Sequence, residues 1–243
     1  MMSAIRMTSA IIAALAGIAI TFQLGNWQLR RAAEKIAIER VWDAAMHATP
    51  AEVRVPSDFA GAAAHLPLHV RARGVFEHGR TIWLDNRSLE GRAGFFVVTP
   101  LRVQGTQQRI LVNRGWAPRD PGDRTRLPPI GRPEGEVEIE GMAVAGVPRV
   151  FQFGNGDTGL IRQNLDLDEA SGELGVPVAR FVLQQISSLD DSLDRNWVAP
   201  SFGVDRHRGY AFQWFSLAAL LAVGVVVMGW RVWRNRTAAP RAA

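Results

Sequence analysis

MTSAIIAALAGIAITFQL, residues 7–24, and YAFQWFSLAALLAVGVVVMGW, residues 210–230, are the two longest uncharged stretches of this 243-residue chain. At 1.5 Å per residue the first run would form a helix about 27 Å long, close to the roughly 30 Å of bilayer hydrocarbon. The second run has aromatic residues at both ends, as segments that cross a membrane interface commonly do. Both runs therefore predict transmembrane helices.

Each run has an alternative interpretation. The first resembles a cleaved signal peptide, but its apolar stretch exceeds the usual length, and Gly25, Asn26 and Trp27 follow it in place of a small-residue cleavage site. The second would also suit a buried core helix, although a chain of this size has little room to enclose one. We therefore favour a retained anchor and a second membrane span.

The charge of the chain is concentrated at its two ends. The net charge is +5, yet residues 7–230 contain 23 basic and 23 acidic residues, so the excess lies entirely in the tails. The five basic residues outside this range are Arg6, Arg231, Arg234, Arg236 and Arg241. This distribution argues against nucleic-acid binding and is typical of segments that flank membrane spans.

The basic residues behind the second span predict that the carboxyl terminus is cytoplasmic. The first span disagrees locally, because Arg30, Arg31 and Lys35 follow it while Arg6 precedes it. Long domains are translocated largely regardless of charge, so we expect both termini to be cytoplasmic. The predicted parts are a cytoplasmic segment 1–6, a span 7–24, a periplasmic β-rich domain 25–209, a span 210–230 and a basic cytoplasmic tail 231–243.

The region between the spans contains short β-prone segments separated by turn signals. We expect a helix over residues 27–46, a loop over 51–67 and a short helix over 167–174. Strands are predicted at 68–73, 81–84, 95–98, 109–113, 136–141 and 179–186, several with apolar and polar residues in alternation. These elements predict an α+β membrane protein in which two transmembrane helices flank a mainly antiparallel, barrel-like β domain.

The sequence provides few groups that could perform chemistry. Cysteine is absent, which excludes thiol catalysis and thiolate metal sites. His65 and His69 are four residues apart, but Pro67 separates them and the zinc motif H-E-x-x-H is not present. No nucleophile elbow or phosphate-binding loop is found. Asp190, Asp191 and Asp194 are expected in a polar, solvated loop. We therefore predict that the protein is not an enzyme.

His207 lies three residues before the second span, at the expected membrane surface. Tyr210 and Trp214 follow at +3 and +7, so they share its face if the helix begins early enough. Such a face would present an imidazole, a common axial ligand of haem iron, beside Arg206 and Arg208, which suit carboxylates. The alternative is a histidine among the basic residues that anchor the end of a span.

Four segments resemble the Surfeit-locus cytochrome c oxidase assembly factors. They are Leu24-Gly25-Asn26-Trp27-Gln28 with Arg31 and Lys35; Gly91-Arg92-Ala93-Gly94 with Val98-Thr99-Pro100-Leu101; Leu111-Val112-Asn113-Arg114-Gly115-Trp116-Ala117-Pro118; and His207-Arg208-Gly209-Tyr210 with Trp214-Phe215. One departure is Asp205-Arg206, where the family often has two asparagines. From the residues themselves, we interpret Trp27 as an interfacial anchor, Gly115 as a positive-φ turn residue and Arg114 as a group that fixes neighbouring loops.

The resemblance implies a role in the maturation of haem–copper oxidases. It implies that the protein acts on the catalytic subunit as haem a is inserted, with haem a synthase as a candidate second partner and the lipid bilayer around the spans. It also implies transient haem a binding, with His207 as the candidate iron ligand and Tyr210 and Trp214 beside the macrocycle. No Arg- and Ser-rich transit sequence precedes the first span, so we expect the membrane to be a bacterial inner membrane.

Two other functions remain open. A cofactor-free scaffold would bind the oxidase subunit through small residues of its spans, such as Ala13, Gly17, Ala218 and Gly224. An unrelated membrane-anchored enzyme or sensor is the third hypothesis. The absence of cysteine argues against copper delivery, because copper-carrying factors use thiolates.

Overall fold

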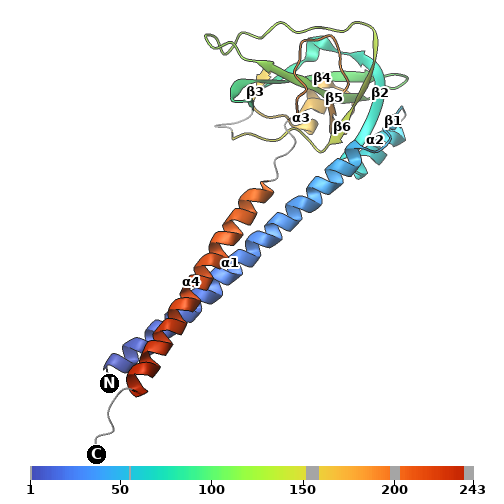
Figure 1. The fold of residues 1–243 in the computed structure, drawn as a ribbon. Helices are drawn as coiled ribbons and strands as arrows, with labels where there is room; N and C mark the ends of the chain where they lie inside the picture. Colours follow the sequence, from blue (N-terminus) through green and yellow to red (C-terminus); the bar gives the residue numbers. More distant parts are fainter. Residues whose placement is uncertain (1, 55, 152–158, 198–202, 238–243) are drawn as a thin grey trace, which may run out of the picture. The chain divides into compact units, whose positions relative to one another are not determined.

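The computed structural model describes residues 2–54, 56–151, 159–197 and 203–237 (Figure 1). The chain divides into two compact units: unit 1 comprises residues 1–40 and 200–243, and unit 2 comprises residues 41–199. Unit 1 is helical, whereas unit 2 contains every strand of the described residues.

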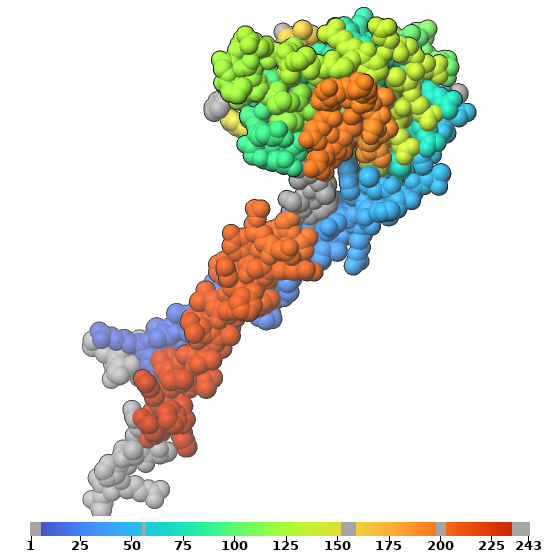
Figure 2. Space-filling model, turned by 45° about the horizontal axis from the view of Figure 1, so that its top comes forward, coloured from blue at the N-terminus to red at the C-terminus, as the bar shows by residue number. Residues whose placement is uncertain are grey.

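Unit 1 is built from helix α1, Met2–Met46, whose last residues belong to unit 2, and helix α4, Val204–Thr237. Both helices are long and apolar enough to cross a membrane, and their most apolar 18-residue segments have mean hydropathies of 1.8 and 2.1. The two helices are antiparallel, since Gly17 faces Leu221 while Gly25 faces Phe215. Figure 2 shows α4, orange to red, packed along the blue α1.

Small side chains allow the two helices of unit 1 to approach closely. A Cβ atom added to Gly25 would lie 2.7 Å from the ring of Phe215, and one added to Gly17 would lie 3.2 Å from Leu221. Ala218 is also buried, whereas Gly224 has no atom within 4 Å of such a Cβ. Gly17 and Ala218 were expected on a surface that faces a partner protein. They contribute instead to the packing of this hairpin, as small residues do in membrane helix pairs.

Unit 2 is a mixed sheet with short helices. Its elements are β1 (Ala51–Val53), α2 (Pro56–Ala64), β2 (Leu68–Phe76), η1 (His78–Arg80), β3 (Ile82–Leu89), β4 (Arg92–Val103), β5 (Arg109–Pro118), β6 (Glu136–Val144), β7 (Ile161–Arg162), α3 (Leu167–Leu174) and β8 (Val178–Gln185). All six predicted strands and the helix at 167–174 are present. The predicted loop at 51–67 was wrong in part, because it contains β1 and α2.

The strand order is β1-β2-β6-β8-β5-β4-β3-β7, with an additional β2–β4 pairing. Three pairings, β1–β2, β3–β7 and β5–β8, are parallel, and the other five are antiparallel. The sheet is therefore mixed, with the expected antiparallel pairings in the majority. The β2–β4 contact joins only residues 74–76 to 101–103. It links β2, β6, β8, β5 and β4 in a cycle of pairings, but the predicted barrel is not confirmed.

Strand β5 occupies the centre of unit 2, between β4 and β8. Its residues are buried almost without interruption, as expected for a strand covered on both faces, whereas β2 alternates more clearly between buried and exposed positions. The main hydrophobic cluster lies beneath α2, where Phe59 stacks against Phe181 of β8. A second cluster lies beneath α3, so the two helices cover different parts of the sheet.

Candidate functional site

The candidate haem-binding residues lie in the first turns of α4. This helix begins at Val204, early enough for His207, Tyr210 and Trp214 to lie on one face at spacings of three and four residues. His207 and Trp214 are partly buried, and Tyr210 is 46% exposed. The structure therefore brings the three side chains to one face, where a flat ligand would meet an imidazole and two aromatic rings.

The imidazole of His207 has a partner on α1. Its Nδ1 lies 2.6 Å from Oε1 of Gln28, a residue 179 positions earlier in the chain. Gln28 is 8% exposed and belongs to the segment 24–28 that follows the first apolar run. This contact joins the two terminal motifs of the sequence within unit 1.

The hydrogen bond determines which ring nitrogen of His207 is available to bind a metal ion. An amide oxygen can only accept, so Nδ1 of the neutral ring carries the proton and Nε2 carries the lone pair. Nε2 has no hydrogen-bond partner among the residues that the structure describes. Histidines that ligate metals commonly donate their other N–H to such an acceptor, so His207 fits an axial ligand of haem iron.

The packing around this contact explains the glycine of the α1 motif. Phe22 meets Phe215 edge to face, with ring centroids 5.5 Å apart, and Gly25 leaves space for the same ring. A larger residue at position 25 would push α4 away and separate Gln28 from His207. The sequence indicated Gln28 only as part of a motif, because nothing local identifies a partner on a distant helix.

A second motif, Asn113-Arg114-Gly115-Trp116, lies within β5 and forms a buried polar network. Arg114 is fully buried; its Nη2 donates to Oδ2 of Asp191 and to the carbonyl of Gly131, both at 2.9 Å. Its guanidinium carbon also lies 4.9 Å from the ring centre of Phe76. Arg114 therefore connects two loops to the central strand, as predicted.

Asp191 is completely buried, so the expectation of a solvated loop was wrong for this residue. Its Oδ2 accepts hydrogen bonds from both Arg114 and Arg195. Burial lowers the pKa of the Arg114 guanidinium, and Asp191 opposes that change.

Gly115 has the predicted positive φ, 153°, but it lies in a strand and not in a turn. The pairing of β4 and β5 changes register beside it, between Val97 and Val98. A Cβ atom at this position would lie 2.7 Å from Cβ of Leu193. Glycine is therefore required by both the backbone conformation and the segment that passes close by.

The other histidines have structural contacts. His69, in β2, directs Nδ1 to the carbonyl of Ala48 at 2.9 Å, and its Nε2 lies 3.0 Å from Oε1 of Glu140. His65 and His78 each contact a backbone carbonyl. Among the described residues, no three histidine, aspartate or glutamate side chains form a group that could hold a metal ion.

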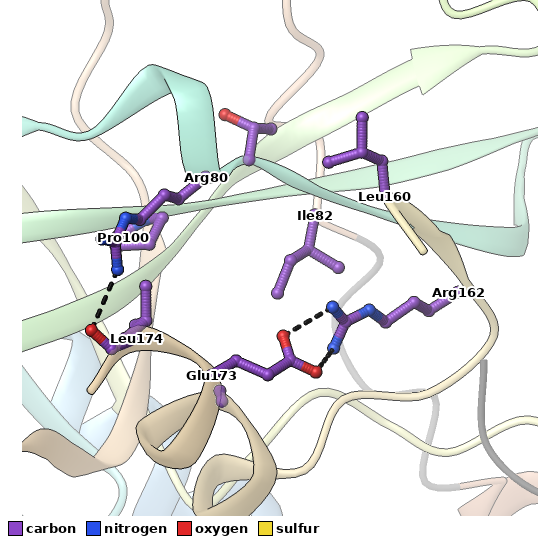
Figure 3. A pocket seen from close by; sticks show the side chains of 9 residues that line it. Arg80, Ile82, Pro100, Leu160, Arg162, Glu173 and Leu174 are labelled. Atoms are coloured by element: carbon purple, nitrogen blue, oxygen red, sulfur yellow. Dashed lines mark hydrogen bonds and ion pairs between the residues drawn. The ribbon is translucent and has the colours of Figure 1, made fainter. Parts of the chain in front are cut away.

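A cavity of about 170 Å³ lies between β3 and α3 (Figure 3). Arg162 forms two hydrogen bonds to Glu173 at its mouth, and Arg80 donates to the carbonyl of Leu174. We interpret the cavity as a packing gap bridged by two arginines, since none of its lining side chains, all within the described residues, has a buried polar atom that lacks a partner.

Comparison with known proteins covers most of the chain. The model of the SURF1 family matches residues 15–219. A SURF1-like protein of Rickettsia bellii is 30% identical over 208 residues, 82% of each chain. A SURF1-like protein of Drosophila melanogaster is 29% identical over 83% of this chain and 71% of its own. Surfeit locus protein 1 of Arabidopsis thaliana is 36% identical over 42% of this chain, but the match spans only 31% of that protein.

The family match includes both halves of the Gln28–His207 contact and the buried motif of β5, so the features that define unit 1 and the centre of unit 2 lie inside it. The chain belongs to the SURF1 family.

Proposed function

We propose that the protein assists the assembly of haem–copper cytochrome c oxidase by holding haem a at His207 while the catalytic subunit receives it. SURF1 proteins are known in general as cytochrome oxidase assembly factors, which supports the broader part of this proposal. The observation that carries the finer part is the hydrogen bond from His207 Nδ1 to Gln28, which leaves Nε2 available as a metal ligand.

The residues near His207 would divide the task of binding. His207 would provide the axial nitrogen, Gln28 would hold the imidazole in the required tautomer, and Tyr210 and Trp214 would contact the macrocycle. Arg206 and Arg208 are exposed on the same turns and would meet the propionate carboxylates. Haem a, when bound, supplies an iron centre that the oxidase uses; this chain would hold it and release it.

The proposed location is a bacterial inner membrane. Both helices have the length and hydropathy of membrane spans, and a bacterial relative aligns over most of its length. We propose that both termini are cytoplasmic and that unit 2 is periplasmic. Reporter fusions at Val150 and after residue 237 would test this, with export expected only at Val150; cytosolic activity at Val150 would refute the topology.

The haem proposal is tested by the colour of the purified protein. The full chain, purified in detergent from cells that make haem a, should show a Soret band that His207→Ala abolishes. His47→Ala is the matched control, because His47 is an exposed histidine just after the end of α1. This variant should leave the band unchanged. An unchanged band in His207→Ala would exclude this histidine as the ligand.

The alternative function is a cofactor-free scaffold for the oxidase subunit. It would give a colourless wild-type protein that still copurifies with the catalytic subunit. The exposed apolar side chains on both helices of unit 1, including Ile12 and Leu220, favour this candidate because they are available to partner helices as well as to lipid.

A further inference from the structure

One face of α1 carries a shallow, widely open hollow, called the groove below, that the proposed function does not use. It is lined by Ala19, Ile20, Gln23, Leu24, Trp27 and Arg30 and has a volume of about 500 Å³. The spacing of three and four residues places these side chains in a single stripe along the helix. The groove lies entirely within unit 1.

The groove changes character along its length. Ala19, Ile20 and Leu24 form an apolar part inside the predicted span, and Ile20 is 60% exposed. Trp27 follows at the level where aromatic residues mark a membrane interface. Arg30 ends the stripe, ten residues and about 15 Å beyond Ile20 along the helix axis. This order of apolar, aromatic and cationic groups matches an amphiphile with an anionic head.

The charge of Arg30 is not neutralised within the described part of the chain. Arg30 is exposed and forms no ion pair with a described residue, whereas its neighbour Arg31 lies 2.6 Å from Glu34. A zwitterionic lipid would cover the apolar part but would leave the guanidinium without a net negative partner. An anionic headgroup supplies that partner, and a phosphate suits the donors of arginine.

The distribution of charge in the sequence provides a separate argument. Arg30, Arg31 and Lys35 follow the first span on the side of unit 2, where the positive-inside rule does not favour cations if the carboxyl terminus is cytoplasmic. Arg31 already has Glu34 as its partner, whereas Arg30 forms no ion pair with a described residue, so binding an anionic headgroup would give Arg30 a role on that side.

We propose that this groove is a binding site for an anionic phospholipid, with an acyl chain along Ala19, Ile20 and Leu24 and the phosphate at Arg30. The proposal rests on α1 crossing a membrane and is independent of haem binding at His207. A partner helix on the same stripe is the competing occupant, and it does not explain the unpaired guanidinium.

Native mass spectrometry of the full chain released from detergent tests the headgroup. With equal amounts of phosphatidylglycerol and phosphatidylcholine, the wild type should retain about fivefold more of the anionic lipid, the effect of one cation near a membrane surface. Arg30→Gln should abolish this preference. Arg31→Gln removes the same charge one position away from the groove and should preserve it, as should His207→Ala.

The apolar part is tested by filling the groove. Ala19→Phe should reduce the retention of both lipids, whereas Ala13→Phe, at an exposed position outside the groove, should not. Circular dichroism would establish that each variant keeps its helix content. The proposal would be overturned if Arg30→Gln and Arg31→Gln lost the lipid preference equally, or if the two phenylalanine variants lost lipid equally. A wild type with no lipid preference, or with a bound haem mass in place of a lipid mass, would also overturn it.

Discussion

The imidazole of His207 and the side-chain amide of Gln28 meet at 2.6 Å, although 179 residues separate them in the sequence. The contact connects the segment that ends the first apolar run with the segment that begins the second helix. It places a histidine with one satisfied ring nitrogen on the surface of a helical hairpin.

Replacing Gln28 should weaken haem retention without removing the iron ligand. Gln28→Ala leaves Nδ1 of His207 without its acceptor, and the loss of such a supporting hydrogen bond typically costs 10- to 100-fold in metal affinity. Gln28→Glu should retain haem, because a carboxylate accepts the same bond. Soret absorbance per protein gives the measurement, and Gln213→Ala, at an exposed amide of α4, is the control. A full Soret band in Gln28→Ala would show that the amide is dispensable.

Gly25→Ala should destabilise the hairpin of unit 1. The added methyl group would lie 2.7 Å from the ring of Phe215, and overpacking of this kind costs about 1–3 kcal/mol. Gly224→Ala is the matched control, since no atom lies within 4 Å and alanine is the better helix former. The midpoint of thermal unfolding in detergent should fall only for Gly25→Ala. Restoration of that midpoint by Phe215→Leu would assign the loss to this contact.

Asp191→Ala should strongly destabilise unit 2. The change would leave the buried guanidinium of Arg114 without its counter-ion, which typically costs about 3–5 kcal/mol. Asp190→Ala removes an equal charge from the adjacent exposed position and should have little effect. Urea unfolding of the full chain, followed by tryptophan fluorescence, gives the two free energies. Similar free energies of unfolding for the two variants would show that the Arg114–Asp191 ion pair contributes no more to stability than an exposed charge does.

Glu140 should contribute to the acid sensitivity of unit 2. Its hydrogen bond with Arg71 is the largest cause that lowers the pKa of Glu140 from its usual value of 4.5, and the charge of His69 acts in the same direction. A carboxylate with a lowered folded pKa stabilises the fold above its unfolded pKa, and this stabilisation is lost as the pH falls through the folded value.

Thermal unfolding between about pH 5 and pH 3 tests this contribution. The midpoint of the wild type should fall more steeply with decreasing pH than that of Glu140→Gln, which has no such proton to gain. Glu134→Gln, at an exposed glutamate, should follow the wild-type curve. Parallel curves for the wild type and Glu140→Gln would indicate that other carboxylates determine the acid transition.

Local patterns in the sequence were sufficient to locate most elements of unit 2. The alternation at residues 68–73 and 136–141 identified β2 and β6, because a half-buried strand must place apolar residues at every second position. The bounds of α3 agreed with the prediction, and its ends are explained by the Asp166 cap and by Gly175 with φ 65°. The α2 helix was missed, since Pro56 and the alanines after it were interpreted as a loop.

The pairing of the strands was harder to predict from the sequence. The parallel contact between β5 and β8 joins Val112 to Leu183, across a long stretch of chain. No periodicity within either strand distinguishes a parallel from an antiparallel neighbour, so the three parallel pairings of the mixed sheet were not predicted. The same limitation explains why Asp191, predicted to be solvated, was found beside Arg114.

The sequence by itself determined the two apolar helices, the β-rich region between them and the position of His207 near the start of the second helix. Each of these follows from residues that are neighbours in the chain, where hydropathy and spacing act directly on local structure. Only the tertiary structure decided that Gln28 supports His207 and that Asp191 neutralises Arg114. Both pairs lie far apart in the chain, 179 and 77 residues, so their contacts exist only after helices and strands pack together.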